Sequence, residues 1–347
     1  MSDLRQTLEH LLQRQHLSEM QAAELLHALT DGSVAAPMAG ALLAALRSKG
    51  VIADEVRGFA RAMRKLARRP ELPAGGGPLI DMVGTGGDAS GSFNLSTGAA
   101  LLAAALGLRV AKHGNRSISS RSGSADLIEA LGLKLPLDER AAGACLQATG
   151  FTFLFAPHFH PAMKAVAPIR QALGVRTVFN ILGPLTNPAE PPFHVIGAFN
   201  AETAEIIAQT LAGLPMERCF VVHGAAGWDE PTPIGPFILH DVRPGQVRQL
   251  WREPSEWGLT LCHEAELHGG DALHNAAALR AVFSGEDRGA HRDALILGAA
   301  LMLEVTGMVE KPLDAAEVAR DAVDSGKAAA VLEKLAEFGK KRIADSG

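Results

Sequence analysis

Hydrophobic residues near the N-terminus recur at helical spacing, and the pattern predicts four helices in the first 70 residues. The first helix carries its leucines at intervals of three and four or next to one another, at Leu4, Leu8, Leu11 and Leu12. Ser18 and Gln21 match the capping box that opens a second helix. A third helix is expected from Pro37 to Gly50, and a fourth from Asp54 to Arg68.

The pattern changes after RRPELPAGGGP, residues 68–78, whose prolines and glycines predict a linker or hinge. Beyond it, short apolar runs alternate with helical segments, which is typical of a parallel sheet covered by helices. The expected strands are Leu79–Val83, Leu108–Lys112, Phe151–Phe155, His194–Phe199 and Cys219–Val222. The expected helices between them are Ser96–Leu106, Ser124–Leu131, Glu139–Thr149 and Ala201–Leu214. Phe237–Val242 and Val247–Trp251 flank a hairpin turn, and the last hundred residues are expected to be mainly helical.

Together these patterns predict an α/β protein with a small N-terminal helical domain and a large α/β domain built on a mainly parallel central sheet. We place the helical domain at residues 1–72, joined by a segment near 165–190, and the α/β domain at residues 73–347. The amphipathic N-terminal helices offer an apolar face for a homodimer, or for packing within one subunit.

Composition narrows the class of protein. A hydrophobic fraction of 47% is enough for a substantial core. The net charge of −5 gives no general attraction to nucleic acid or membranes, so any site for an anion must be local. Three widely spaced cysteines form neither a disulfide framework nor a zinc pattern, and the N-terminus lacks the apolar core of a signal peptide. We therefore expect a cytoplasmic protein.

The stretch DMVGTGGDASGSFNLSTG, residues 81–98, has the composition of an anion site. Gly84, Gly86 and Gly87 let the backbone turn tightly after a strand and bring N–H groups against phosphate oxygens. A helix N-terminus follows, which adds further N–H donors. Four side chains supply polar groups there, namely Ser92, Asn94, Ser96 and Thr97. We expect at least one serine or threonine to cap the helix, but four polar residues exceed what one cap requires.

A second candidate loop is KHGNRSISSRSGSAD, residues 112–126. Lys112 ends an expected strand, where open α/β sheets place their ligands, and Arg116 adds a second charge. Asn115 offers an amide, and the hydroxyls come from Ser117, Ser119, Ser120, Ser122 and Ser124. The alternative is a solvated serine-rich loop with a helix cap near Ser124.

The adjacent acids Asp229 and Glu230 follow another expected strand. Paired carboxylates at this position suit Mg²⁺, which takes oxygen ligands and shares them with substrate phosphates. A solvated turn is the alternative for an isolated acidic pair. The position of this pair in the strand–loop rhythm, opposite two phosphate-type loops, favours metal binding.

Taken together, these motifs resemble the anthranilate phosphoribosyltransferase family over nearly the whole chain. The resemblance rests on DMVGTGGD, FNLST, KHGNRSISS, SGSADLIEALG, RTVFNILGPLTNP and the later acidic pair. Thymidine and pyrimidine-nucleoside phosphorylases share the fold but lack a KHGN loop of this form. The resemblance implies transfer of a phosphoribosyl group from phosphoribosyl pyrophosphate (PRPP) to the amine of anthranilate. Pyrophosphate is released, in the second committed step of tryptophan biosynthesis.

The resemblance also implies roles for individual residues. PRPP would be bound by Gly84, Gly87, Asp88, Ser92, Asn94, Leu95, Ser96, Thr97, Lys112, His113, Gly114, Asn115, Arg116, Ser117, Ile118, Ser119, Ser120 and Ser124. Anthranilate would be contacted by Gly84, Asn115 and Arg170, and two Mg²⁺ ions per subunit would be held by Ser96, Asp229 and Glu230. Lys112 would stabilise the transition state, with no protein nucleophile. The family implies a homodimer through the helical domain, and Arg170 must reach the cleft between the two domains.

Some positions depart from the family pattern. Met163 stands where many members have tyrosine, Ala89 where a glycine is usual, and Trp228 and Pro231 beside the acids where small or aliphatic residues are more frequent. These departures leave two alternatives. One is a phosphoribosyltransferase that uses a different aromatic acceptor, and the other is an enzyme similar to pyrimidine-nucleoside phosphorylases.

Overall fold

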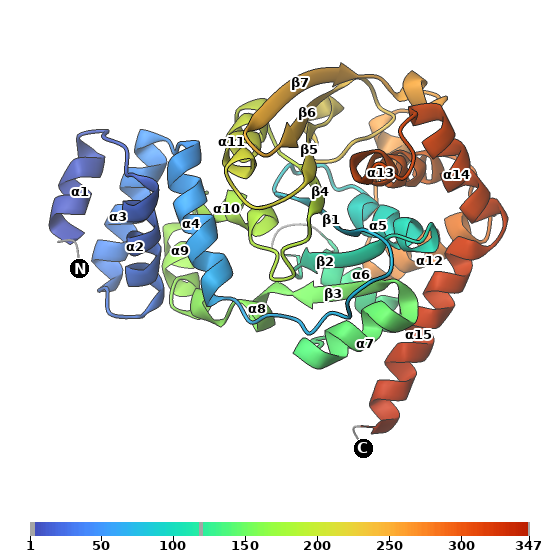
Figure 1. The fold of residues 1–347 in the computed structure, drawn as a ribbon, viewed down its shortest axis with the longest axis horizontal. Helices are drawn as coiled ribbons and strands as arrows, with labels where there is room; N and C mark the ends of the chain where they lie inside the picture. The colour runs from blue at the N-terminus through green and yellow to red at the C-terminus, as the bar shows by residue number, and fades with distance from the viewer. Residues whose placement is uncertain (1–3, 118–120, 346–347) are drawn as a thin grey trace.

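The computed structural model describes residues 4–117 and 121–345, and its centre is a seven-stranded sheet. The strands lie in the order β3-β2-β1-β4-β5-β6-β7 (Figure 1). The first five pair in parallel, and β6 pairs antiparallel with both β5 and β7. Their bounds are β1 Leu79–Gly84, β2 Arg109–Gly114, β3 Phe151–Phe155, β4 Phe193–Gly197, β5 Arg218–His223, β6 Phe237–Arg243 and β7 Gln246–Arg252. The predicted fold class is confirmed, including the hairpin of β6 and β7.

The four N-terminal helices form where the hydrophobic spacing predicts them. They are α1 Leu4–Leu12, α2 Glu19–Thr30, α3 Ala36–Lys49 and α4 Ala53–Leu66. Ser18 and Gln21 form the expected capping box, in which the Ser18 hydroxyl accepts from the Gln21 N–H and the Gln21 side chain accepts from the Ser18 N–H. Figure 1 shows these helices side by side at one end of the molecule.

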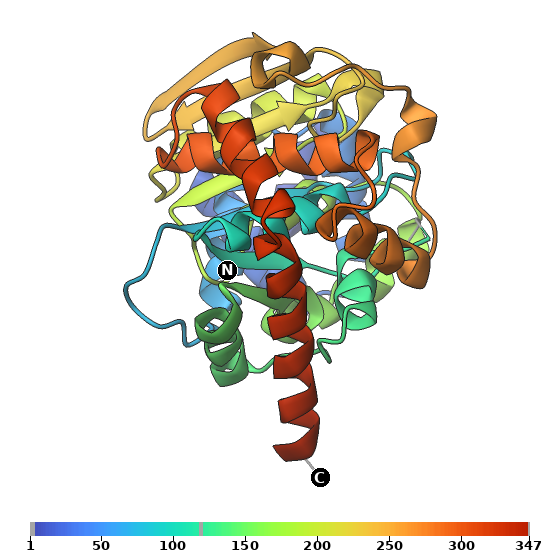
Figure 2. The ribbon, with the colours of Figure 1, turned by 90° about the vertical axis from the view of Figure 1, so that its right-hand side faces the viewer.

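Helices cover both faces of the sheet. Those that follow the linker are α5 Leu95–Ala105, α6 Ser124–Ala130, α7 Glu139–Thr149, α8 Ala156–Phe159, α9 Ala167–Leu173, α10 Phe179–Leu182 and α11 Ala201–Ala212. The C-terminal group is α12 Ala272–Phe283, α13 Ala290–Thr306, α14 Pro312–Asp324 and α15 Lys327–Asp345. Figure 2 shows α15 running past the sheet and carrying the C-terminus beyond it. None of the helices in the described ranges is long and apolar enough to cross a membrane.

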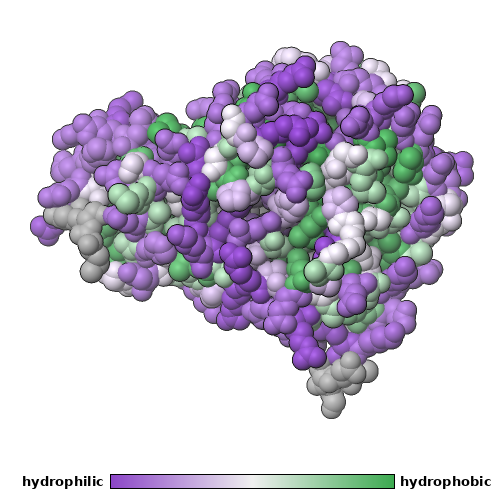
Figure 3. All heavy atoms as spheres, viewed as in Figure 1, coloured by the Kyte–Doolittle hydropathy of each residue, from purple (hydrophilic) through white to green (hydrophobic). Residues whose placement is uncertain are grey.

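Neighbouring side chains on a strand point to opposite faces of the sheet, so the apolar side chains form two cores. Val195 and Phe220 face a core that also contains α5 and α13, whereas Ile196 and Val221, their neighbours in the chain, face the other side. This second core runs through α11 and α10 into the four N-terminal helices. The outer surface in Figure 3 is hydrophilic over much of the visible face, with smaller apolar areas between.

The segment near 165–190 packs on the helical side. Phe179 of α10 lies edge-on to Phe59 of α4, with 6.3 Å between the ring centres. Leu173 of α9 lies close enough to Gly40 of α3 that a Cβ there would meet it at 3.9 Å. The domain bounds at residues 72 and 73 stay a prediction, but this packing places the segment beside α3 and α4.

Two of the expected strand ends were wrong. The second strand does not end at Lys112, because pairing with β3 continues through His113 and Gly114. These two residues therefore belong to β2 rather than to the loop. The strand expected to run to Phe199 ends at Gly197, where its pairing with β1 and β5 also ends.

Arginines of α4 attach the helical end of the molecule to the α/β part. Arg57 donates to the carbonyl oxygens of Gln209 at 3.1 Å and Thr210 at 3.3 Å, in the last turn of α11. Arg61 donates to Gly213 O at 2.8 Å, just past the end of the same helix. These carbonyls lie at the C-terminal end of the helix, where the helix dipole is negative, so cationic donors suit them.

We expect Arg57→Ala to lower the free energy of unfolding by about 1–3 kcal/mol, because it removes two charge-assisted hydrogen bonds to α11. The measurement is denaturant unfolding followed by circular dichroism. Arg47→Ala, an exposed arginine on α3, is the matched control and should change the free energy by less than about 0.5 kcal/mol. Equal stability of the Arg57→Ala variant and the unmodified protein would show that this contact does not stabilise the fold.

Candidate active site

The site lies at the carboxyl ends of the parallel strands. The order β3-β2-β1-β4-β5 places the chain's change of direction between β1 and β4, where open α/β sheets bind their ligands. The glycine-rich loop follows β1, the KHGN loop follows β2, and the acidic pair follows β5. The fold thus brings to one edge three motifs that are far apart in the sequence.

Asp229 sits directly on the ends of β1 and β4. Its Oδ2 accepts a hydrogen bond from the Gly86 N–H at 2.5 Å and from the Thr85 hydroxyl at 3.4 Å. A Cβ at Gly84 would lie 2.4 Å from this oxygen, and one at Gly197 would lie 1.6 Å from the Asp229 carbonyl oxygen. Both strands must therefore end in glycine for the acid to approach.

Glu230 reaches the N-terminus of α5, where its Oε1 accepts from the Ser96 N–H at 3.3 Å. The N-cap residue is Asn94, and no side chain at the N-cap makes a capping hydrogen bond. The expectation that a serine or threonine caps this helix was therefore wrong. An acid from a distant loop takes an N–H in its first turn instead, which is favourable because the helix N-terminus carries partial positive charge.

Burial makes this acidic pair electrostatically unusual. Burial, and after it the nearby charge of Asp88, raise the pKa of Asp229 to about 7. The pKa of Glu230 rises to about 8 through burial first and then the charge of Asp229. Asp88 stays close because its Oδ2 accepts from the Asp229 backbone N–H at 3.3 Å. Three acids thus crowd one buried place, where a cation would compensate their charge.

The residues present fit a magnesium ion shared with a ligand. The carboxylates of Asp229 and Glu230 and the hydroxyl of Ser96 are the oxygen donors that Mg²⁺ prefers. Within the described ranges, no group of three or more histidine, cysteine or acidic side chains is arranged to hold a metal by itself. This suits Mg²⁺, which keeps several water ligands and completes its shell with substrate phosphates.

Lys112 lies beneath the acids, inside β2 rather than in the loop, and is only 1% exposed. Its Nζ donates to the carbonyl oxygen of Met82 and to the Ser96 hydroxyl, the latter at 3.3 Å. Burial lowers its pKa, while the charges of Asp81, Glu230 and Asp229 oppose this. Lys112 is therefore placed to act on the groups bound around Ser96.

A buried network that the sequence motifs did not single out supports Lys112. Asn187 donates to Asp81 Oδ2 and to the carbonyl oxygen of Ala111, both at 2.8 Å. Burial raises the pKa of Asp81 to about 6 against the opposing charge of Lys112. Asn187 stands in the motif RTVFNILGPLTNP, so its position in the sequence was visible but its contact with β1 was not.

The glycine-rich loop and the KHGN loop touch each other. Asn94 Nδ2 donates to the Ser122 carbonyl oxygen at 3.1 Å, and the Ser122 hydroxyl donates to Asn94 Oδ1 at 3.2 Å. Ser124 turns inward, and its hydroxyl donates to the Asn115 carbonyl oxygen at 3.2 Å. Ile118, Ser119 and Ser120 lie outside the described residues. The predicted convergence of the two loops is thus seen in their described parts.

The sequence indicated that Arg116 offers its positive charge to a ligand, but in the structure this charge is paired with two acids of the protein. It forms two hydrogen bonds with Glu129, at 2.5 and 2.8 Å, and one with Asp126 at 3.1 Å. Asp126 also accepts from the backbone N–H groups of Ser117 and Gly123 and so holds the loop to α6. In this structure Arg116 ties the loop down.

Arg170 and His113 lie toward the helical side of the site. The Arg170 guanidinium lies 5.4 Å from the centre of the Phe179 ring, and burial lowers its pKa. His113 shares a hydrogen bond of 3.1 Å with the Gly183 carbonyl oxygen and lies edge-on to His160. The contacts found for Arg170 among the described residues do not join it to the glycine-rich loop, so its acceptor role stays a prediction.

Arg176 makes the link that Arg170 does not. It donates to the Gly87 carbonyl oxygen, and its guanidinium stacks 4.3 Å from the centre of the Phe199 ring. The Phe199 N–H in turn donates to the Thr85 hydroxyl at 3.2 Å. Arg176 is the first residue of the motif RTVFNILGPLTNP, but no pattern in the sequence was a reason to assign this arginine a role.

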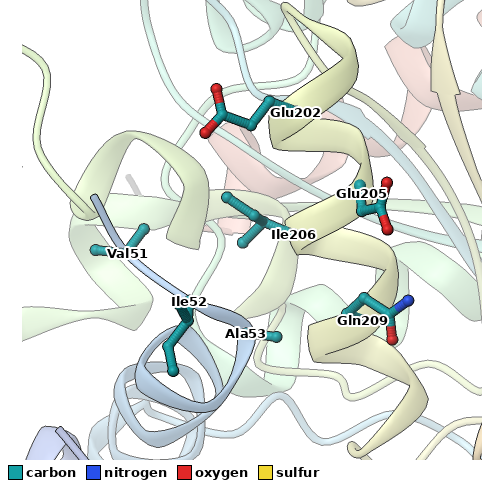
Figure 4. Close-up of a pocket in the computed structure, with 7 residues that line it drawn as sticks. All are labelled: Val51, Ile52, Ala53, Glu202, Glu205, Ile206 and Gln209. Atoms are coloured by element: carbon teal, nitrogen blue, oxygen red, sulfur yellow. The ribbon is translucent and has the colours of Figure 1, made fainter. Parts of the chain in front are cut away.

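An open pocket lies between the α3–α4 connection and α11 (Figure 4). Its volume is about 360 Å³, and its walls come from residues 51–53 on one side and from Glu202, Glu205, Ile206 and Gln209 on the other. None of the predicted site residues lines it.

Comparison with known proteins identifies a family whose two domains match the two parts of this fold. Residues 5–67 match the helical bundle domain of a glycosyl transferase family, and residues 76–329 match its a/b domain. Anthranilate phosphoribosyltransferase from Pelotomaculum thermopropionicum is 44% identical over 335 residues, which is 96% of each chain. The chain belongs to the anthranilate phosphoribosyltransferase family. The resemblance carried by the sequence motifs is thereby confirmed.

Solved structures of anthranilate phosphoribosyltransferases agree along nearly the whole chain. The enzyme from Thermus thermophilus superimposes with a TM-score of 0.89 at 42% identity, covering 96% of this chain and 99% of that one. The enzyme from Saccharomyces cerevisiae, in complex with PRPP and Mg, gives a TM-score of 0.88 at 28% identity, covering 97% and 98%. The same yeast enzyme is also known in complex with 4-fluoroanthranilate.

We expect Gly197→Ala to destabilise the fold by about 1–3 kcal/mol, because the new methyl group would overlap the Asp229 backbone. Gly183→Ala is the control, since a Cβ there meets no atom within 4 Å and the residue has a helical backbone conformation. Denaturant unfolding of the two variants provides the comparison. If both changed stability equally, the close seat of Asp229 on β4 would be wrong.

Proposed function

We propose that this protein transfers the phosphoribosyl group of PRPP to the amine of anthranilate. In this reaction the bond between the ribose anomeric carbon and the pyrophosphate oxygen breaks, and a bond from that carbon to the amine nitrogen forms. Pyrophosphate leaves, and the amine loses one proton. The observation that supports this proposal best is the buried pair of Asp229 and Glu230, set between two loops rich in N–H and hydroxyl donors.

PRPP carries the charge that these loops are built to receive. The Gly86 and Ser96 N–H groups point to the place where the two carboxylates lie. We propose that PRPP is bound there by Gly84, Gly87, Asp88, Ser92, Asn94, Leu95, Ser96, Thr97, Lys112, His113, Gly114, Asn115, Arg116, Ser117, Ile118, Ser119, Ser120 and Ser124. Arg116 must loosen its pairing with Glu129 to take part.

We propose that Ser96, Asp229 and Glu230 hold Mg²⁺, two ions per subunit. When bound, the ions would offset the negative charge that develops on the pyrophosphate leaving group. The buried ammonium of Lys112, close to both acids, is the chain's own contribution to offsetting the same charge. Preorganised charge of this kind needs no rearrangement during the reaction.

The acceptor is recognised by its carboxylate and its position. Arg170 suits this carboxylate because a guanidinium donates two parallel hydrogen bonds, and we assign Asn115 and Gly84 to the same subsite. An aromatic amine is neutral and nucleophilic at pH 7, so the reaction requires positioning rather than a protein nucleophile or an essential base. Arg170 and the sheet edge belong to different parts of the molecule, so closure of the two parts would exclude water.

A different aromatic acceptor is the second candidate. Ala89, where a glycine is usual in the family, has a φ of 60°, a conformation that costs a residue with a side chain more than it costs glycine. Trp228, beside the acids, is buried. An assay of a panel of aromatic amines with PRPP and Mg²⁺ separates the two candidates, because only the first requires anthranilate to be the best substrate.

Assembly and location remain part of the proposal. We propose a cytoplasmic homodimer that joins through the helical domain, residues 1–72, while residues 73–347 bind PRPP. The linker between them is held along its length, since the Arg68 and Glu71 N–H groups donate to Phe159 and Glu139 carbonyl oxygens at 2.9 Å. Any hinge motion at residues 68–78 must therefore break these hydrogen bonds or move their acceptors together with the linker.

We expect Asp229→Asn combined with Glu230→Gln to abolish Mg²⁺-dependent turnover, because neutral amides bind Mg²⁺ far more weakly than carboxylates. The measurement is the loss of anthranilate fluorescence at increasing Mg²⁺ concentration. The matched control, Glu202→Gln with Glu205→Gln, removes two exposed acids of α11 and should keep full activity. Unchanged turnover in the first double variant would remove the metal from the proposal.

Arg170→Ala should raise the KM for anthranilate about 10- to 100-fold, the cost of one charge-assisted contact, with little change in the KM for PRPP. Steady-state kinetics with each substrate varied in turn measures the two constants. Arg170→Lys, which keeps the charge but loses the paired donors, should lie between the variant and the unmodified enzyme. An equal rise in both constants would argue against a dedicated carboxylate contact.

A further inference from the structure

Asn275 lies on α12, far from the three site motifs in sequence, yet it contacts the glycine-rich loop directly. The side chain is only 1% exposed. Its Nδ2 donates to Asn94 Oδ1 at 2.8 Å, and its Oδ1 accepts from the Gly270 N–H at 2.7 Å. Neither the sequence motifs nor the proposed function gives this residue a role.

The two hydrogen bonds fix which way the Asn275 amide points. A backbone N–H can only donate, so the atom that faces Gly270 must be the carbonyl oxygen of Asn275. The amino group of Asn275 therefore faces Asn94 and can only donate. The atom of Asn94 that receives it must be the carbonyl oxygen.

The orientation of Asn94 follows from that of Asn275. Its Oδ1 also accepts from the Ser122 hydroxyl at 3.2 Å, and its amino group faces the Ser122 carbonyl oxygen at 3.1 Å. That carbonyl can only accept, so it requires the same orientation. One of the two amino hydrogens is used there. Among residues 4–117 and 121–345 no partner is found for the other, which can serve as a donor at the junction of the two loops.

We propose that Asn275 is a positioning residue that orients the Asn94 amide so that its amino group, not its carbonyl oxygen, faces PRPP. This inference rests on the proposed function, because it assigns Asn94 to an oxygen of the sugar diphosphate. A reversed amide would present a partial negative charge to a polyanion. Asn275 thus acts on the substrate only through Asn94.

The segment before α12 holds the same loop in place. The Phe93 N–H donates to the Leu267 carbonyl oxygen at 2.8 Å, and the Gly269 N–H donates to the Gly91 carbonyl oxygen at 2.9 Å. A Cβ at Gly269 would lie 2.8 Å from the backbone of Phe93, so the two backbones are in close contact. The loop backbone is therefore already supported without Asn275. What Asn275 adds is the orientation of the Asn94 amide, which it fixes together with the Ser122 carbonyl oxygen.

The test is a double-mutant cycle with Asn275→Leu and Asn94→Ala, read by calorimetric titration of PRPP in the presence of Mg²⁺. Leucine has the same branched outline as asparagine, although it is larger, and it lacks both hydrogen-bonding groups. We expect Asn275→Leu to weaken PRPP binding about tenfold, the cost of one misplaced hydrogen bond. In the Asn94→Ala background the same substitution should change PRPP affinity by less than about twofold, because residues that act through one another are not additive.

Further variants separate positioning from packing. Asn275→Asp keeps the acceptor for Gly270 and the side-chain shape, so it covers the case in which the leucine variant does not fold. An aspartate cannot donate to Asn94 Oδ1, so we expect its loss of PRPP affinity to be at least as large as that of leucine. At saturating PRPP the KM for anthranilate should stay unchanged. Leu273→Ala, an exposed position on the same helix, should leave PRPP binding unchanged.

The outcomes distinguish this inference from the function on which it rests. If the unmodified protein binds no PRPP, the proposed function fails and the inference fails with it. If the unmodified protein binds PRPP and Asn275→Leu binds it equally well, only the inference is overturned. The same holds if the loss is equally large in the Asn94→Ala background, since Asn275 would then act independently of Asn94.

Discussion

The site depends on one constraint, which is that two adjacent acids are buried against backbone N–H groups at the end of a parallel sheet. Asp229 takes the Gly86 N–H and Glu230 takes the Ser96 N–H in the first turn of α5. Glycines at the ends of β1 and β4 give the room for this approach. Burial holds the pKa values of both acids well above their usual range, so the arrangement favours any cation that can enter.

The remaining fold serves to hold this place fixed. Lys112 and Asp81 lie under the acids within β2 and β1, and Asn187 closes the network from the other side. The two substrate loops are fastened to each other through Asn94 and Ser122. On the helical side, Arg57 and Arg61 attach α4 to the end of α11, so the N-terminal helices are anchored to the α/β part. Because Asp229, Glu230, Lys112 and Ser96, which we propose bind the ligands, contact strand ends and a helix start, the sheet positions them.

Local pattern was enough to predict most of the strands and helices. The strand Phe151–Phe155 and the helix Glu139–Thr149 have the bounds that their apolar spacing indicated. The second strand was predicted to end too early because His113 is polar and Gly114 has no side chain, and only their pairing with β3 shows that the strand continues. The motifs also indicated which loops would meet, since loops after neighbouring parallel strands share one edge of the sheet.

What the sequence could not supply were the contacts between distant segments. Glu230 accepts a hydrogen bond at the start of α5 from a residue 134 positions away in the sequence, and Asn275 and Asn94 are separated by 181 positions. Arg57 and its partner on α11 are separated by more than 150. Nothing in local spacing predicts such partners, because they are chosen by the packing of whole elements. The same holds for Arg116, whose pairing with Glu129 is set by the position of α6. The sequence therefore indicated the chemical groups at the site more accurately than it indicated which residues those groups contact.

The most direct test is a calorimetric titration of the unmodified protein with PRPP, once with Mg²⁺ and once with a chelator in its place. A buried acidic pair repels a polyanion unless a cation lies between them. The account therefore predicts clear binding with Mg²⁺ and at least about a hundredfold weaker binding without it, a difference of about 2.7 kcal/mol. Equal affinity under both conditions, or no heat under either, would contradict it.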